Sequence, residues 1–99
     1  MHCEEVMVDD MIQLNVEGRI DSNSSSEFQM KVLQAYTKSN SLIINMENVT
    51  YLSSAGLRVF LMGARTASSK GGKQIIVNAT PIVRDVFRIS GVEGNLDIR

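Results

Sequence analysis

The sequence has one cysteine, one histidine and no excess of charge of either sign, and each shortage excludes a class of protein. Cys3 alone cannot form an intramolecular disulfide, which is typical of a reducing compartment. His2 and Cys3 are too few for a zinc set, and the chain holds no Cys/His or Ser/His/Asp constellation. His2 lies at a terminus that we expect to fray, and Cys3 is expected to be a small residue of the first strand. We therefore predict no enzyme, no metal and no cofactor.

The charge and hydropathy patterns exclude further partners. Ten Lys and Arg residues oppose eleven Asp and Glu residues, for a net charge of −1, so no basic surplus indicates nucleic acid or an anionic membrane. No apolar run approaches the roughly 18 residues that a membrane-spanning helix needs. The acidic, polar start, Met1–Glu5, is unlike a secretory signal. We predict a cytoplasmic protein.

The length and the composition indicate one globular domain. Apolar residues make up 43% of the chain and charged residues 21%, which are ordinary values for a folded protein and argue against disorder. A chain of 99 residues can bury one modest core but not two. No repeat or linker is visible, so we expect a single domain over residues 1–99.

The first half of the chain predicts a hairpin followed by a helix. Residues 11–17 alternate apolar and polar side chains, as a half-covered strand does, and Gly18 is expected to end that strand. Asp9-Asp10 connects it to a weaker strand over residues 3–8. A helix should follow the serine run, because Ser24 and Glu27 have the spacing of a capping box.

The second half alternates short apolar strands with helices. Residues 42–44 and 74–77 are continuously apolar or nearly so, as in buried strands, and residues 47–50 are expected to turn the chain. A second helix should begin at Ser53-Ser54. Thr80-Pro81 indicates the start of a third helix. Its inward face should comprise Ile82, Val83, Val86 and Phe87, and a short last strand should include Leu96 and Ile98.

This order predicts an α/β fold. Helices between strands imply parallel pairing with right-handed crossovers, so we expect a mixed, mainly parallel sheet of four to five strands with the helices mostly on one face. Ligand sites gather where parallel strands end. Three loops meet that condition, over residues 18–23, 47–54 and 78–80.

The loop that precedes the second helix carries the most informative residues. Ser53 and Ser54 lie where unpaired backbone N–H groups and the helix dipole favour negative charge, so the fold would tolerate a phosphate there. Gly56 leaves the backbone bare, which would let another protein approach closely. The alternative is that one of these serines only caps the helix.

Two segments resemble the hallmarks of a known family. Residues 51–58, Tyr-Leu-Ser-Ser-Ala-Gly-Leu-Arg, resemble the signature of the STAS domain, and specifically of the bacterial anti-sigma factor antagonists. Residues 18–22, Gly-Arg-Ile-Asp-Ser, resemble the family's G-x-[ILV]-D segment. Ser90-Gly91 resembles the pair that ends a later helix in the family. The three matches stand in the family's order and imply a single STAS domain.

The resemblance implies a phosphorylation switch. Family members bind an anti-sigma factor that is also a serine kinase, and so free a sigma factor to direct transcription. The kinase phosphorylates the serine two residues before the glycine, here Ser54, and a metal-dependent PP2C-type phosphatase reverses the modification. Ser53 stands where several members carry aspartate, so it is the less favoured acceptor. The partner surface implied here comprises Asp21, Ser22, Ser53, Ser54, Ala55, Gly56 and Arg58.

Three other interpretations stay open. A receiver-like domain would need clustered acidic residues where the strands end, whereas Asp9-Asp10 precedes the alternating strand. A nucleotide-binding enzyme would need a glycine-rich phosphate loop, and Gly71-Gly72 follows a helix rather than a strand. The third alternative shares the fold: a STAS module that serves as a scaffold, or as a subunit of a transporter or lipid-transport assembly, without phosphorylation.

Overall fold

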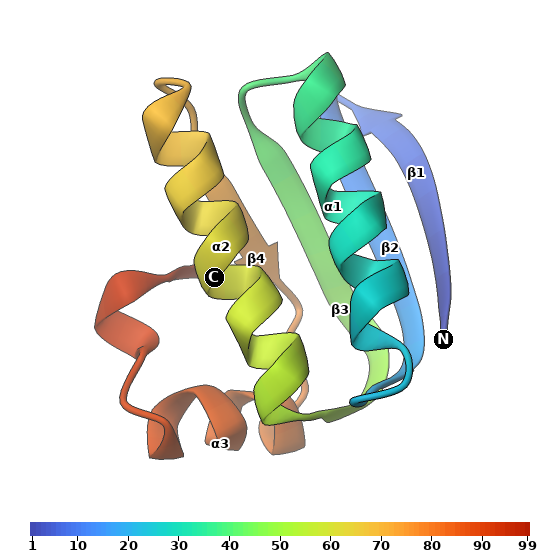
Figure 1. Ribbon diagram of the computed structural model, residues 1–99, viewed down its shortest axis with the longest axis vertical. Coiled ribbons are helices and arrows are strands. Elements are labelled where there is room, and N and C mark those ends of the chain that lie inside the picture. Colours follow the sequence, from blue (N-terminus) through green and yellow to red (C-terminus); the bar gives the residue numbers. More distant parts are fainter.

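The computed structural model describes residues 1–99, which form a five-stranded sheet with helices packed against one face (Figure 1). The strands lie side by side in the order of the sequence. The elements are β1 (His2–Val8), β2 (Met11–Ile20), α1 (Ser25–Lys38), β3 (Leu42–Leu52), α2 (Ser54–Ser69), β4 (Gln74–Val77), α3 (Pro81–Ile89), the 3-10 turn η1 (Glu93–Asn95) and β5 (Asp97–Ile98). The predicted fold class is confirmed.

The predicted hairpin joins β1 and β2, which pair antiparallel along the whole of β1. Its two-residue turn is Asp9-Asp10, and both residues have positive φ, at 50° and 67°. A turn of that kind matches the right-handed twist of the flanking strands, and Asp tolerates positive φ better than most residues. All other pairs in the sheet are parallel.

Strands β2 and β3 are longer than the sequence predicts. The expectation that Gly18 ends β2 is wrong, because β2 continues to Ile20; Gly18 adopts a φ of +94° beside an irregularity in the pairing. The expectation of a turn over residues 47–50 is also wrong, because β3 runs through them. At two places β3 has one residue more than β2, and bulges absorb the extra residues. Pairing with a neighbouring strand overrides the local turn preference.

Helix α1 begins as predicted, but its capping differs. The capping box of Ser24 and Glu27 is wrong: Ser24 is the residue that precedes the helix, yet its side chain makes no capping hydrogen bond. Its backbone is already helical, with φ −100° and ψ −9°, and its hydroxyl lies 2.8 Å from the carbonyl oxygen of Arg19. The Asp21 carboxylate instead accepts from the backbone N–H groups of Asn23 and Ser24, in the turn before α1.

A core of 20 buried apolar residues lies between the sheet and the helices. Figure 1 shows α1 and α2 side by side in front of the sheet, with α3 across the end where β3 and β4 finish. The rings of Phe28 and Phe60 lie 5.1 Å apart and those of Phe60 and Phe87 5.5 Å apart, so one phenylalanine from each helix meets in the core. Ile82, expected to face inward, is 62% exposed; the inward turn of α3 is centred on Val83 and Phe87 instead.

One polar side chain, Gln74, is buried with this core. Its amide nitrogen donates to the carbonyl oxygen of Phe60 at 2.8 Å, and its amide oxygen accepts from the hydroxyl of Tyr36 at 3.1 Å. Burial raises the pKa of Tyr36, so its hydroxyl stays protonated and can donate. Gln74 thus joins β4 to both long helices, and Gly63 on α2 leaves the space that its amide fills.

Candidate functional site

The ends of β2 and β3 meet at one point on the sheet edge. Ile20 and Leu52 are paired in the parallel register, and the backbone N–H of Ser53 donates to the carbonyl oxygen of Ile20 at 2.8 Å. The next residues along the two strands, Asp21 and Ser53, therefore start neighbouring loops. Two of the three loops predicted as sites are brought together by this pairing.

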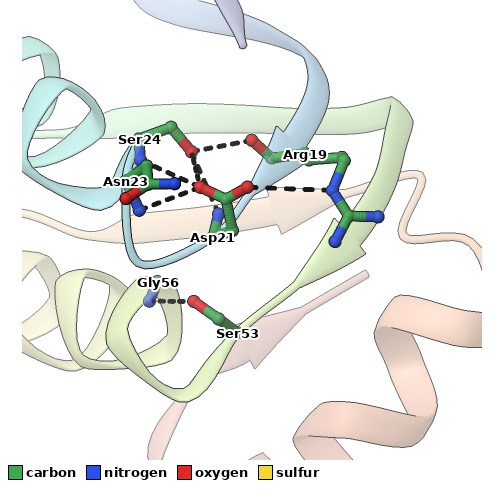
Figure 2. A network of polar contacts seen from close by, with 6 residues as sticks. All are labelled: Arg19, Asp21, Asn23, Ser24, Ser53 and Gly56. Atoms are coloured by element: carbon green, nitrogen blue, oxygen red, sulfur yellow. Dashed lines mark hydrogen bonds and ion pairs between the residues drawn. The ribbon is translucent and has the colours of Figure 1, made fainter.

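The two adjacent serines at the start of α2 have different surroundings. The hydroxyl of Ser53 accepts a hydrogen bond from the backbone N–H of Gly56 at 3.1 Å, so Ser53 caps the helix (Figure 2). Its carbonyl oxygen also accepts from the N–H of Leu57 at 2.9 Å. Ser54, the first residue of α2, is exposed, and its hydroxyl makes no hydrogen bond within the chain. Capping thus occupies Ser53 and leaves Ser54 free.

Gly56 is buried against the end of β2, which corrects the interpretation made from the sequence. A Cβ at this position would lie 2.6 Å from Cγ2 of Ile20 and 2.8 Å from Cδ1 of Leu52. The missing side chain therefore makes room for this protein's own core instead of exposing bare backbone to a partner. This close approach places the first turn of α2, and with it Ser54, directly beside the carboxyl end of β2.

The loop after β2 is organised around the carboxylate of Asp21 (Figure 2). Its Oδ1 accepts hydrogen bonds from the backbone N–H groups of Asn23 and Ser24, both at 3.0 Å. The N–H of Ser24 is the main cause that lowers the pKa of the Asp21 carboxyl below its ordinary value; the N–H of Asn23 and the guanidinium of Arg19 act in the same direction. The carboxylate is therefore ionised and orders the start of α1.

Sequence reasoning missed a pair beside this loop, Arg19 and Tyr51. The two residues are register partners on β2 and β3, and the guanidinium of Arg19 lies 4.3 Å from the centre of the Tyr51 ring. Its Nε is also 3.7 Å from Oδ2 of Asp21. The only signal in the sequence is that Arg19 belongs to the segment around Asp21, since the contact with Tyr51 depends on the bulged register.

The remaining predicted residues lie at the same edge with different exposure. Ser22 and Arg58 are exposed, whereas Ala55 is half-buried. The third predicted loop, residues 78–80, uses its polar groups within the fold: Thr80 caps α3 by accepting from Val83 at 3.4 Å, and Asn78 donates to Asn45 at 3.0 Å. The exposed predicted residues of the edge are therefore Ser22 in the loop after β2, and Ser54 and Arg58 on α2.

The edge around Ser54 is a surface and not a pocket. Three hollows indent the molecule, the most polar of about 310 Å³ over β1, β2 and β3, and none is lined by Asp21, Ser53 or Ser54. No group of three or more His, Cys, Asp or Glu side chains is placed to hold a metal ion. An open surface of this kind suits contact with another macromolecule better than capture of a small ligand.

The family model of the STAS domain matches residues 4–99, nearly the whole chain. The chain belongs to the STAS domain family. The resemblance drawn from residues 18–22 and 51–58 is thereby confirmed, and both segments lie at one edge of the STAS sheet.

Relatives of this STAS chain include anti-sigma factor antagonists. It is 29% identical to the anti-sigma-B factor antagonist of Bacillus subtilis over 87 residues, which cover 88% of this chain and 80% of the relative. Its fold matches the solved structure of the anti-sigma factor antagonist SpoIIAA in its unphosphorylated form, with a TM-score of 0.82 at 23% identity over 99% of this chain and 88% of that one. It also matches the phosphorylated form of SpoIIAA from Bacillus, with a TM-score of 0.75 at 22% identity over 99% and 91% of the two chains.

None of the helices in this STAS domain combines the length and the apolar content that crossing a bilayer requires. The family and the fold are thus established by the match to the STAS model and by the architecture. The roles of Asp21, Ser54 and Arg58 stay predictions that rest on the geometry described above.

Proposed function

We propose that this STAS protein is an anti-sigma factor antagonist and that phosphorylation of Ser54 switches off its binding to the anti-sigma factor. Unphosphorylated, it binds an anti-sigma factor with serine-kinase activity and so frees a sigma factor. The observation that carries the proposal is the division between the two serines: Ser53 caps α2, and Ser54 presents an exposed, unengaged hydroxyl one residue later. Relatives that are named anti-sigma factor antagonists support the partner class.

In this mechanism the protein is a substrate and a ligand, not a catalyst. The kinase transfers the γ-phosphoryl group of ATP to Oγ of Ser54, which releases ADP and the hydroxyl proton. A PP2C-type phosphatase then uses water to return the free hydroxyl and inorganic phosphate. The metal for that second reaction belongs to the phosphatase. Anti-sigma factors act in the cytoplasm, so we propose the same compartment for this chain.

The electrostatics of the edge explain how a phosphate would end binding. A phosphoserine adds about −1.5 to −2 charges at pH 7. The binding partner's surface, fitted around a bare hydroxyl, would have to take up that charge with no group of its own placed to pair with it, and Asp21 on the neighbouring loop adds repulsion. A loss of about 3 kcal/mol weakens binding roughly 100-fold.

The fold itself should tolerate the modification. Ser54 is the first residue of α2, where the unpaired N–H groups and the helix dipole favour negative charge. The phosphate would project from an exposed position and displace no buried contact. The proposal is therefore a change of affinity without a change of fold.

A pull-down from native extract tests the proposal. Ser54→Ala and Ser54→Asp proteins are immobilised separately, and the captured proteins are identified by mass spectrometry. We expect the alanine form alone to capture an ATPase of the histidine-kinase-like fold. Equal capture of a membrane assembly by both forms would contradict the proposal and favour a STAS scaffold or a subunit of a transporter or lipid-transport assembly.

A further inference from the structure

Helix α2 carries no carboxylate, and its only charged residues are Arg58 and Arg65. Both arginines are exposed. Ser54, Arg58 and Arg65 are spaced by four and then seven residues, so they lie along one side of the helix. A helix that starts with a free serine therefore presents a guanidinium group one turn further along.

Arg58 is not engaged elsewhere in the protein. The four ion pairs of the structure use Arg19, Lys38, Arg88 and Arg99, and the one arginine stacked on an aromatic ring is Arg19. No hydrogen bond from the side chain of Arg58 is formed within the chain. Its guanidinium is thus free to accept a new anionic partner without breaking an existing contact.

The spacing of Ser54 and Arg58 favours such a pairing. Side chains at positions i and i+4 of a helix are neighbours, about 5–6 Å apart at Cβ. Helical side chains lean towards the N-terminus, so Arg58 inclines back over the first turn, where Ser54 lies. An acidic group four residues before a basic one is also the more stabilising order.

We propose that Arg58 is the intramolecular partner of a phosphate on Ser54. The inference rests on the proposed function, because it assumes that Ser54 is the phosphorylated residue. The guanidinium holds the phosphate along the side of α2 by charge-assisted hydrogen bonds. Phosphorylation then changes the surface in two ways. It adds an anion at Ser54, and it occupies the guanidinium of Arg58, the nearer of the two cations on α2, so that this group can no longer pair with a binding partner.

A titration of the phosphorylated protein tests this pairing without the cellular kinase. Phosphoserine is incorporated at position 54 during translation of the full chain, and its second pKa, ordinarily about 6, is followed by ³¹P NMR. A nearby guanidinium stabilises the dianion, so Arg58→Gln should raise this pKa by about 0.3–0.7 units. Arg65→Gln is the matched control and should leave it at the wild-type value. Arg58→Lys should restore part of the shift.

Two outcomes would overturn the pairing. Equal phosphate pKa values in wild type and Arg58→Gln would show that Arg58 does not contact the phosphate. An equal rise in Arg58→Gln and Arg65→Gln would show a general charge effect instead of a specific pair. Because the phosphoserine is placed by translation, these results are separate from the proposed function, which fails if the captured kinase modifies a different residue or if the phosphate leaves partner binding unchanged.

Discussion

The hydroxyl oxygen of Ser53 lies 3.1 Å from the backbone nitrogen of Gly56 and accepts its hydrogen bond. This contact does two things at once, because it satisfies one of the unpaired donors at the start of α2 and it fixes the turn on which Ser54 is exposed. The two neighbouring serines therefore differ in what they do: Ser53 caps α2, whereas the hydroxyl of Ser54 is exposed and free for modification.

Removing each hydroxyl should separate these tasks. Ser53→Ala removes the cap and should lower the free energy of unfolding by about 1 kcal/mol, which lowers Tm by roughly 4–8 °C in a domain of this size. Ser54→Ala removes an exposed hydroxyl without a partner and should stay within about 0.5 kcal/mol of wild type. Urea unfolding of both variants is the measurement. A larger loss for Ser54→Ala would contradict the assignment of the cap.

Gly56→Ala should destabilise the protein although alanine is the better helix former. The added Cβ would lie 2.6 Å from Cγ2 of Ile20, so the β2 end and the first turn of α2 must separate, at a cost of about 1–3 kcal/mol. Gly94→Ala is the control, because no atom lies within 4 Å of the added carbon there. Thermal unfolding of the two variants should differ clearly, and equal Tm values would contradict the close approach.

The Asp21 carboxylate should make stability depend on acidity. Its pKa is lowered in the folded protein, so the unfolded chain binds the proton more readily, and this contribution to stability is fully present above the unfolded pKa of about 3.9. It is lost as the pH falls through the lower, folded pKa. Asp21→Asn should remove this part of the acid dependence. Urea midpoints measured from pH 5 down to pH 2 test it, and parallel curves for the two proteins would refute it.

The buried amide of Gln74 should be coupled to Tyr36. Gln74→Leu leaves the Tyr36 hydroxyl without a partner in the core, at a cost of about 1–3 kcal/mol, and removes the extra donor to the Phe60 carbonyl, which keeps its bond within α2. Adding Tyr36→Phe removes the stranded hydroxyl and should recover part of the loss. A double-mutant cycle by urea unfolding measures the recovery, and strictly additive losses would contradict the network.

Local patterns in the sequence predict the elements well where one face of an element is buried. Ile12, Leu14 and Val16 alternate with polar residues and are all buried, so the strand that they predict is present. The helix starts at Ser53 and Thr80 follow from the same kind of local chemistry, since a side-chain acceptor caps each one. Such features depend on neighbours a few residues away.

The features that the sequence did not predict depend on distant neighbours. Residues 47–50 look like a turn, yet pairing with β2 extends them into β3 with bulges. The contact of Arg19 with Tyr51 exists only in that bulged register. The reason for Gly56 likewise lies in Ile20, 36 positions earlier: the family motif is present, but its glycine makes room for this contact and not for a partner. In each case tertiary pairing decides what a short window cannot show.

The most direct test of the central claim compares two forms of the chain, one with serine and one with phosphoserine at position 54, in calorimetric titrations against the captured kinase. The account predicts binding weaker by roughly 100-fold for the phosphorylated form, with amide spectra whose changes are confined to the start of α2 and the Asp21 loop. Equal affinities, or a rearranged core in the phosphorylated form, would contradict a switch of affinity at Ser54.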